Sequence, residues 1–146
     1  MMNIMFKYKL KKWQFYLLSF TWGLPMTLLG CIASGVLMLF GFRPKKNQYG
    51  WYFDLGVDMG GAFELGCMSV ACCDPSPHIL HHEFGHAIQN CYFGPFMILV
   101  SLASIIRYWY RELVCIVNKV PYSSLPPYDG IWFEGQATKL GEWYDA

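Results

Sequence analysis

Residues 76–95 read SPHILHHEFGHAIQNCYFGP, and this stretch predicts the helix around which the rest of the chain is organised. Ser76 is a residue type that caps helix N-termini, and Pro77 suits the first helical position, where its missing N–H leaves no bond unmade. Gly94 and Pro95 favour a helix end, because glycine accepts a left-handed turn and proline cannot continue the hydrogen-bond ladder. We therefore expect one helix over residues 77–93.

This helix carries an H-E-x-x-H motif, His82-Glu-Phe-Gly-His86, and all four histidines of the chain lie within nine residues of one another. Residues four apart in a helix project from one face, so His82 and His86 can ligate one metal ion. Glu83 lies beside them and can take a proton from water at the metal's open position. The motif predicts metal-assisted hydrolysis.

A third ligand has to come from another segment, because catalytic zinc normally has three protein ligands and one open position. No histidine follows the motif, and His78 lies a full turn before it and points away. Glu134 is the leading candidate, as a lone carboxylate in an apolar segment within a helix expected over residues 130–144. Its alternative role is a surface carboxylate at a helix start. The other candidate ligands are Asp74, Asp129, Glu142 and Cys72 or Cys73.

The motif, the following Gly-Pro and the distal Trp132-Phe-Glu-Gly-Gln-Ala137 resemble gluzincin zinc metallopeptidases over residues 62–144. More narrowly, they resemble small bacterial membrane-associated proteins that share H-E-x-G-H-x-x-Q, a Gly-Pro and W-x-E-x-x-A. The resemblance implies a Zn²⁺ cofactor, with Glu83 as the catalytic base. It implies that the zinc ligands are His82, His86 and Glu134.

The resemblance also implies a peptide-binding strand before the motif helix. In such enzymes this strand pairs with extended substrate by strand addition. Here it corresponds to residues 62–70, where Phe63, Leu65 and Gly66 are the expected substrate-binding residues. Aromatic and branched residues on both sides of the turn-like segment 58–61 predict a β-hairpin centred on that turn.

The composition favours a protein with part of its surface in lipid. Hydrophobic residues make up 55% of the chain and charged residues only 14%, against roughly 25% charged in an average globular chain. So little charge excludes a disordered or nucleic-acid-coating protein. Residues 1–46 carry seven basic and no acidic side chains, whereas residues 47–146 carry four basic and ten acidic ones.

The basic N-terminal part surrounds an uncharged run of 30 residues, 13–42. As one helix this run would reach about 45 Å, longer than the ~30 Å hydrocarbon core, whereas two crossings would need about forty residues. The run is also roughly twice the length of a signal-peptide core. We expect a single tilted or kinked N-terminal span, with residues 1–46 as a membrane anchor.

A second apolar segment is expected to form a helix over residues 96–118. Its uncharged part, 96–106, is too short to span a bilayer, and Arg107 and Arg111 follow among aromatic residues. This pattern is typical of a helix at the membrane–water interface, and a buried core helix fits it equally well.

Together these features predict an α+β protein with an N-terminal transmembrane helix and a minimal zincin-like core over residues 47–146. The expected function is a membrane-integral zinc metallopeptidase that acts on a peptide or protein substrate. The alternatives are a zinc-dependent amidase or lipid-directed hydrolase, and a non-catalytic zinc-binding membrane protein. The expected partners are the lipid bilayer and either further copies of the chain or a larger membrane protein, with no nucleic acid.

Overall fold

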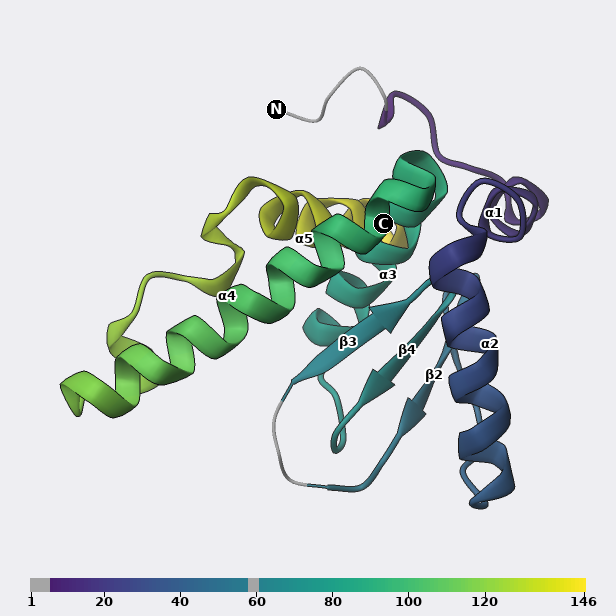
Figure 1. Cartoon of the computed structure of the whole chain (residues 1–146). Coiled ribbons are helices and arrows are strands. Elements are labelled where there is room, and N and C mark those ends of the chain that lie inside the picture. Colours follow the sequence, from purple (N-terminus) through teal and green to yellow (C-terminus); the bar gives the residue numbers. More distant parts are fainter. Residues whose placement is uncertain (1–5, 58–60) are drawn as a thin grey trace.

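The computed structural model describes residues 6–57 and 61–146 (Figure 1). Within these ranges the chain has the predicted α+β fold, with five α-helices and one four-stranded mixed sheet. The elements follow in the order α1 Lys12–Ser19, α2 Leu24–Leu39, β1 Lys45–Asn47, β2 Gly50–Asp54, β3 Ala62–Leu65, β4 Met68–Ala71, α3 Pro77–Phe93, α4 Met97–Asn118 and α5 Trp132–Asp145. Short 3-10 turns lie at Gly94–Phe96, Tyr122–Ser124 and Tyr128–Gly130.

The sheet has the strand order β1-β2-β4-β3, which differs from the predicted hairpin. β2 and β3 flank the segment 58–61 but do not pair with each other, because β4 lies between them, parallel to β2 and antiparallel to β3. The expected turn itself falls largely on residues 58–60, outside the described residues. The expected strand 62–70 is divided into β3 and β4 by a turn at Gly66, whose φ of +70° suits glycine.

Helix α3 has the predicted bounds and occupies the centre of the molecule (Figure 1). The Ser76 hydroxyl accepts a hydrogen bond from the Ile79 amide at 3.3 Å, so the predicted cap is confirmed. At the other end Gly94 has a φ of +58°, as expected of a residue that ends a helix. The final helix, α5, spans 132–145 rather than the predicted 130–144, and it packs along α3.

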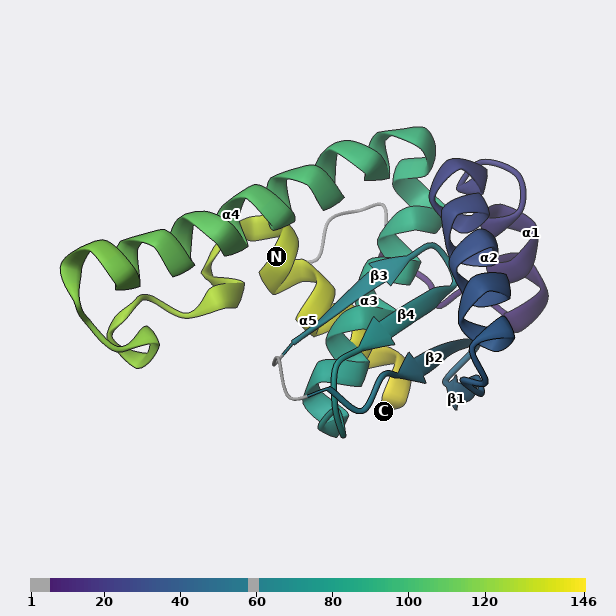
Figure 2. The same cartoon turned by 60° about the horizontal axis from the view of Figure 1, so that its bottom comes forward.

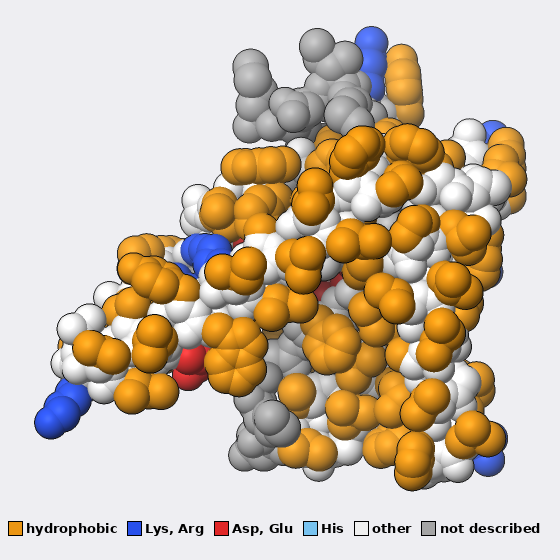
Figure 3. All heavy atoms as spheres, viewed as in Figure 1, with side chains coloured by type: hydrophobic (Ala, Val, Ile, Leu, Met, Phe, Trp, Pro, Cys, Tyr) orange, Lys and Arg blue, Asp and Glu red, His pale blue; other side chains and the backbone are white. Residues whose placement is uncertain are grey.

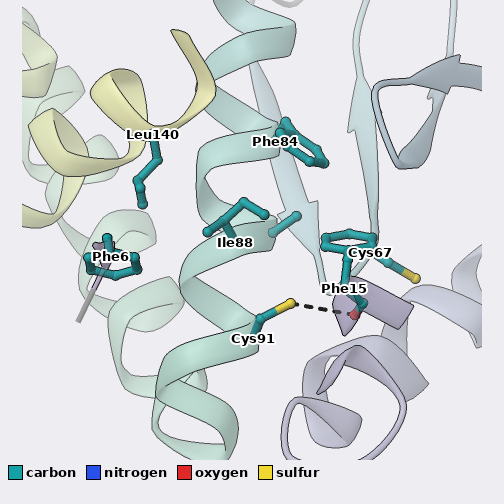
Figure 4. Packing of buried hydrophobic residues seen from close by; sticks show 8 residues of the cluster. Phe6, Phe15, Cys67, Phe84, Ile88, Cys91 and Leu140 are labelled. Carbon is teal, nitrogen blue, oxygen red and sulfur yellow. Dashed lines mark hydrogen bonds between the residues drawn. The ribbon is translucent and has the colours of Figure 1, made fainter. Parts of the chain in front are cut away.

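The hydrophobic core joins α1, α3 and α5, as Figure 4 shows. Phe15 of α1 is fully buried, and its ring centroid lies 5.5 Å from that of Phe84 of α3. Ile88 of α3 and Leu140 of α5 complete this cluster and are also fully buried. The first helix is therefore part of the packed core.

The apolar run 13–42 is not one continuous helix: it forms two helices, α1 and α2, at 93° to each other, a far sharper bend than the kink expected of a single span. The bend has a packing cause at Gly23. A Cβ atom there would lie 2.5 Å from the Asn90 side-chain nitrogen, and that same nitrogen donates to the Gly23 carbonyl at 3.2 Å. The chain therefore turns around a buried polar contact with α3, which a straight span could not make.

The long apolar helix lies later in the chain than expected. The helical stretch Pro77–Asn118, which ends in α4, is long and apolar enough to cross a membrane, judged by length and composition alone. Figures 1 and 2 both show α4 projecting from the rest of the molecule. Within α4 only Met97 and Arg111 are buried, so the interpretation of this segment as a core helix is wrong.

Candidate metal centre

The two histidines of the motif project from one face of α3, as their spacing predicts. Their Nε2 atoms lie 3.2 Å apart, and the two rings are nearly perpendicular, at 89°. Both side chains are mostly shielded from solvent, His86 more so than His82. The pair therefore directs two nitrogen ligands to one point.

Glu134 of α5 completes this cluster, although it is 48 residues from the nearer histidine. Its Oε2 atom lies 3.0 Å from the Nε2 atoms of both His82 and His86, and its side chain is fully buried. The three ligand atoms all lie within 4.8 Å of one another, and this is the only such group in the described residues. The alternative ligands Asp74, Asp129, Glu142, Cys72 and Cys73 do not belong to it.

This donor set fits a divalent transition metal. Two imidazoles and one carboxylate, with an open fourth position, form the ligand set of several catalytic zinc sites. Ligands about 2.1 Å from a tetrahedral ion lie roughly 3.4 Å apart, close to the observed separations. The group His82, His86 and Glu134 could therefore bind a metal.

Two further contacts orient the histidines by their other ring nitrogens. His82 Nδ1 lies 2.8 Å from the Thr138 hydroxyl, and His86 Nδ1 lies 2.8 Å from Oε1 of Gln89. Such contacts hold the ring and direct Nε2 to the metal position. Gln89 is itself fixed by donating to the Phe133 carbonyl at 2.8 Å. Thr138 lies one turn after Glu134, a spacing from which its place beside the site could have been inferred.

Helix α4 also contacts the centre, which sequence reasoning missed. The Ser104 hydroxyl donates a hydrogen bond to Oε1 of Glu134. Burial of Glu134 favours the neutral acid, but hydrogen bonds from the histidines and Ser104 outweigh it and hold the pKa of this carboxyl well below its ordinary value. The carboxylate is therefore ionised, as a metal ligand must be. Nothing local in the apolar segment 96–106 distinguishes Ser104 from Ser101.

Glu83 lies next to the ligands without being part of the cluster. It is buried, and its Oε2 atom has no hydrogen-bond partner among the described residues. Burial raises the pKa of Glu83, whereas the nearby His86 and His82 oppose the increase. A small cavity of about 10 Å³, lined by Glu83, Ser69 and Asn47, lies against it. A cavity of this size holds about one water molecule.

A third buried glutamate, Glu64, was not predicted as a site residue. It lies on β3 directly opposite Ser69 of β4, and its Oε1 atom has no partner in the described part of the chain. Burial raises the pKa of Glu64 well above its ordinary value, and the charge of Glu83 adds to the increase.

Burial lowers the pKa of His86, but hydrogen bonding to Glu134 and the nearby carboxylates raise it to about 9.

The expected substrate-binding residues lie on and after β3, which is the edge strand of the sheet next to α3. Phe63 is half exposed and Leu65 is partly buried. Gly66 packs against α2, where a Cβ atom would lie 2.4 Å from Cα of Thr27. Its lack of a side chain therefore serves internal packing. The strand leaves one edge unpaired by any other strand among the described residues.

Comparison with known proteins gave no relative. No protein-family model matches the chain, no curated protein matches it, and no solved structure matches its fold.

Proposed function

We propose that the protein is a membrane-associated zinc metallopeptidase of the gluzincin type. The observation that carries this proposal is the convergence of His82, His86 and Glu134 from two helices on one point, next to a buried Glu83. The ligand set matches the open catalytic sites of zinc hydrolases rather than closed structural sites, which use four ligands and favour cysteine. A base beside such a site is the arrangement that peptide hydrolysis needs.

In this mechanism Glu83 accepts a proton from the attacking water and returns it to the leaving amine. A bound zinc ion would polarise the scissile carbonyl and acidify water at its open position. The unpartnered Oε2 of Glu83 supports this role, because the carboxylate is not engaged in an internal hydrogen bond. Thr138 and Gln89 keep the two histidine rings in place during turnover.

The substrate would be an extended peptide paired with the free edge of β3. Strand addition satisfies the backbone hydrogen-bonding groups of the peptide and places it next to the catalytic base Glu83 of α3. Phe63 and Leu65 would contact its side chains. The edge position of β3 and its contact with α3 support this placement.

Attachment to the bilayer is proposed to occur through α4 and α2. The large side chains Leu99, Leu102, Ile105 and Ile106 of α4 are all at least half exposed. On the face shown in Figure 3, hydrophobic side chains extend from α2 across to α4. Contiguous exposed apolar patches of this kind mark membrane or protein interaction sites. Alternatively, a second copy of the chain or a larger membrane protein would cover this exposed apolar surface.

A lipid-directed hydrolase on the same metal is the second candidate function. It is favoured by the Ser104–Glu134 hydrogen bond, which places an exposed apolar helix directly at the metal centre. A substrate in the bilayer would then have a short path to the ligands.

The test measures zinc content and hydrolysis on the full chain in lipid nanodiscs. We expect about one zinc in wild type and in Glu83→Gln, no zinc in His86→Ala, and loss of peptide hydrolysis in both variants. His78→Ala is the matched control, because His78 is exposed on the same helix outside the cluster. A Glu83→Gln protein that hydrolyses peptides as fast as wild type would overturn the role of Glu83. Cleavage of lipids but not peptides would favour the second candidate.

A further inference from the structure

A second cavity lies outside the metal centre, between helices α1 and α2 and strands β1 and β2. It is a depression wide open to solvent, with a volume of about 590 Å³. It is lined by the first half of α1, the second half of α2 and the strands β1 and β2. None of the residues of the metal centre lines it.

Three lysines line this cavity and come from two separate segments of the chain. Lys12 is the first residue of α1, and Lys45 and Lys46 lie on β1. All three are exposed, and no acidic residue lines the cavity. Lys46 lies opposite Trp51 in the sheet, on the face that lines the cavity, whereas the Lys45 ammonium lies over the Tyr52 ring and 3.8 Å from Asp54. Lys12 and Lys46 therefore supply an excess of two positive charges at the cavity. This charge distribution suits an anionic group.

The wall behind the lysines is apolar because its aromatic residues use their polar atoms internally. Trp51 donates its indole N–H to the Ser34 hydroxyl at 3.3 Å, and the Tyr16 hydroxyl donates to the Tyr49 carbonyl. The ring faces therefore remain for contact with an apolar ligand. Met38, on the last turn of α2, extends this wall towards solvent.

We propose that this cavity binds one anionic phospholipid, with the phosphate at Lys12 and Lys46 and an acyl chain against Trp51 and Met38. A free phosphate would use the lysines but leave the aromatic wall without a partner. A neutral lipid would use the wall but leave two positive charges without a partner. The cavity opens beside the exposed end of α2, where Leu39 is 88% exposed, so a lipid can enter it from a bilayer that contacts α2.

Binding is tested with delipidated full-length protein in a neutral detergent, by native mass spectrometry and titration calorimetry. The probes are dihexanoyl-phosphatidylglycerol, dihexanoyl-phosphatidylcholine and inorganic phosphate. We expect one phosphatidylglycerol per chain, with the other two probes weaker by about tenfold or more, since each lysine contributes to attraction of an anionic headgroup. Equal binding of phosphatidylcholine would overturn the charge recognition. Equal binding of phosphate would show a free-anion site instead.

Variants localise the bound lipid to the cavity. The double variant Lys12→Gln/Lys46→Gln and the single variant Met38→Glu should each weaken phosphatidylglycerol binding by about tenfold. Their controls are Lys119→Gln, an exposed lysine at the far end of α4, and Leu39→Glu, the neighbouring residue that does not line the cavity. If the controls lose as much affinity as the variants, the lipid binds elsewhere. His86→Ala should bind lipid normally, so this result is independent of the proposed enzyme activity.

Discussion

Gly85 of α3 lies directly against the backbone of Ala137 of α5, so that a Cβ atom at Gly85 would stand 1.8 Å from the Ala137 carbonyl oxygen. The same closeness recurs one turn further along α5, where a Cβ at Gly141 would stand 1.7 Å from the His81 carbonyl. The two helices are thus in backbone contact along the length that carries the ligands. This contact brings Glu134 within 3.0 Å of both histidines.

Gly85→Ala should therefore separate α3 from α5 and abolish metal binding. Because the obstacle is a backbone carbonyl, the helices must move, and overpacking of this kind costs about 1–3 kcal/mol of the free energy of unfolding. Zinc content and thermal unfolding measure the two effects. Gly35→Ala is the control, because a Cβ at Gly35 in α2 meets nothing within 4 Å. A Gly85→Ala protein with full zinc content would show that the helix contact does not set the ligand geometry.

Gln89→Ala should weaken zinc binding by about 10- to 100-fold, because the orienting contact to His86 Nδ1 is lost. It should also destabilise the fold by about 2 kcal/mol, since the Phe133 carbonyl loses its donor in a buried position. Competition with a chromophoric chelator measures the zinc affinity. Gln48→Ala removes a partly buried amide that donates to the Gly141 carbonyl of α5 at 3.3 Å, away from the ligands, and should leave zinc affinity unchanged.

Ser104→Ala should lower zinc affinity by about tenfold, because Glu134 loses the hydrogen bond that orients its second oxygen. Ser104→Thr, which keeps the hydroxyl, should restore most of the affinity. The absorption spectrum of the Co²⁺-loaded protein reports the ligand geometry and should change in the alanine variant alone. Ser101→Ala on the same helix serves as the control. A spectrum identical to wild type in Ser104→Ala would contradict a positioning role.

Replacement of Leu102, Ile105 and Ile106 together by Gln should reduce the binding of the protein to lipid vesicles. Each exposed apolar side chain of this size gains about 1.5–3 kcal/mol on transfer from water to an apolar medium. Vesicle flotation measures the loss, and zinc content should not change, because none of the three is a ligand. Val57→Gln, on an exposed loop, is the control. Flotation equal to wild type would assign membrane attachment to α2 instead of α4.

The helix of the metal motif could be predicted to the residue, because its signals are local. Ser76 caps the first turn of α3 and Gly94 ends its last turn, so these two residues set the limits of the helix. The face that carries His82 and His86 follows from helix periodicity in the same way. Glu134 could be proposed because it is a lone carboxylate in the otherwise uncharged segment Trp132–Ala137.

Other features had no local signal. The amino-acid sequence by itself determined the α+β class, the motif helix and the histidine pair, since these depend on residues at most a few turns apart. The tertiary structure alone decided that the apolar run 13–42 bends by 93°, that β4 separates β2 from β3, and that Ser104 lies at the metal centre. Each of these depends on contacts between segments far apart in the chain, where close packing and the satisfaction of buried polar groups select among arrangements that local patterns allow equally.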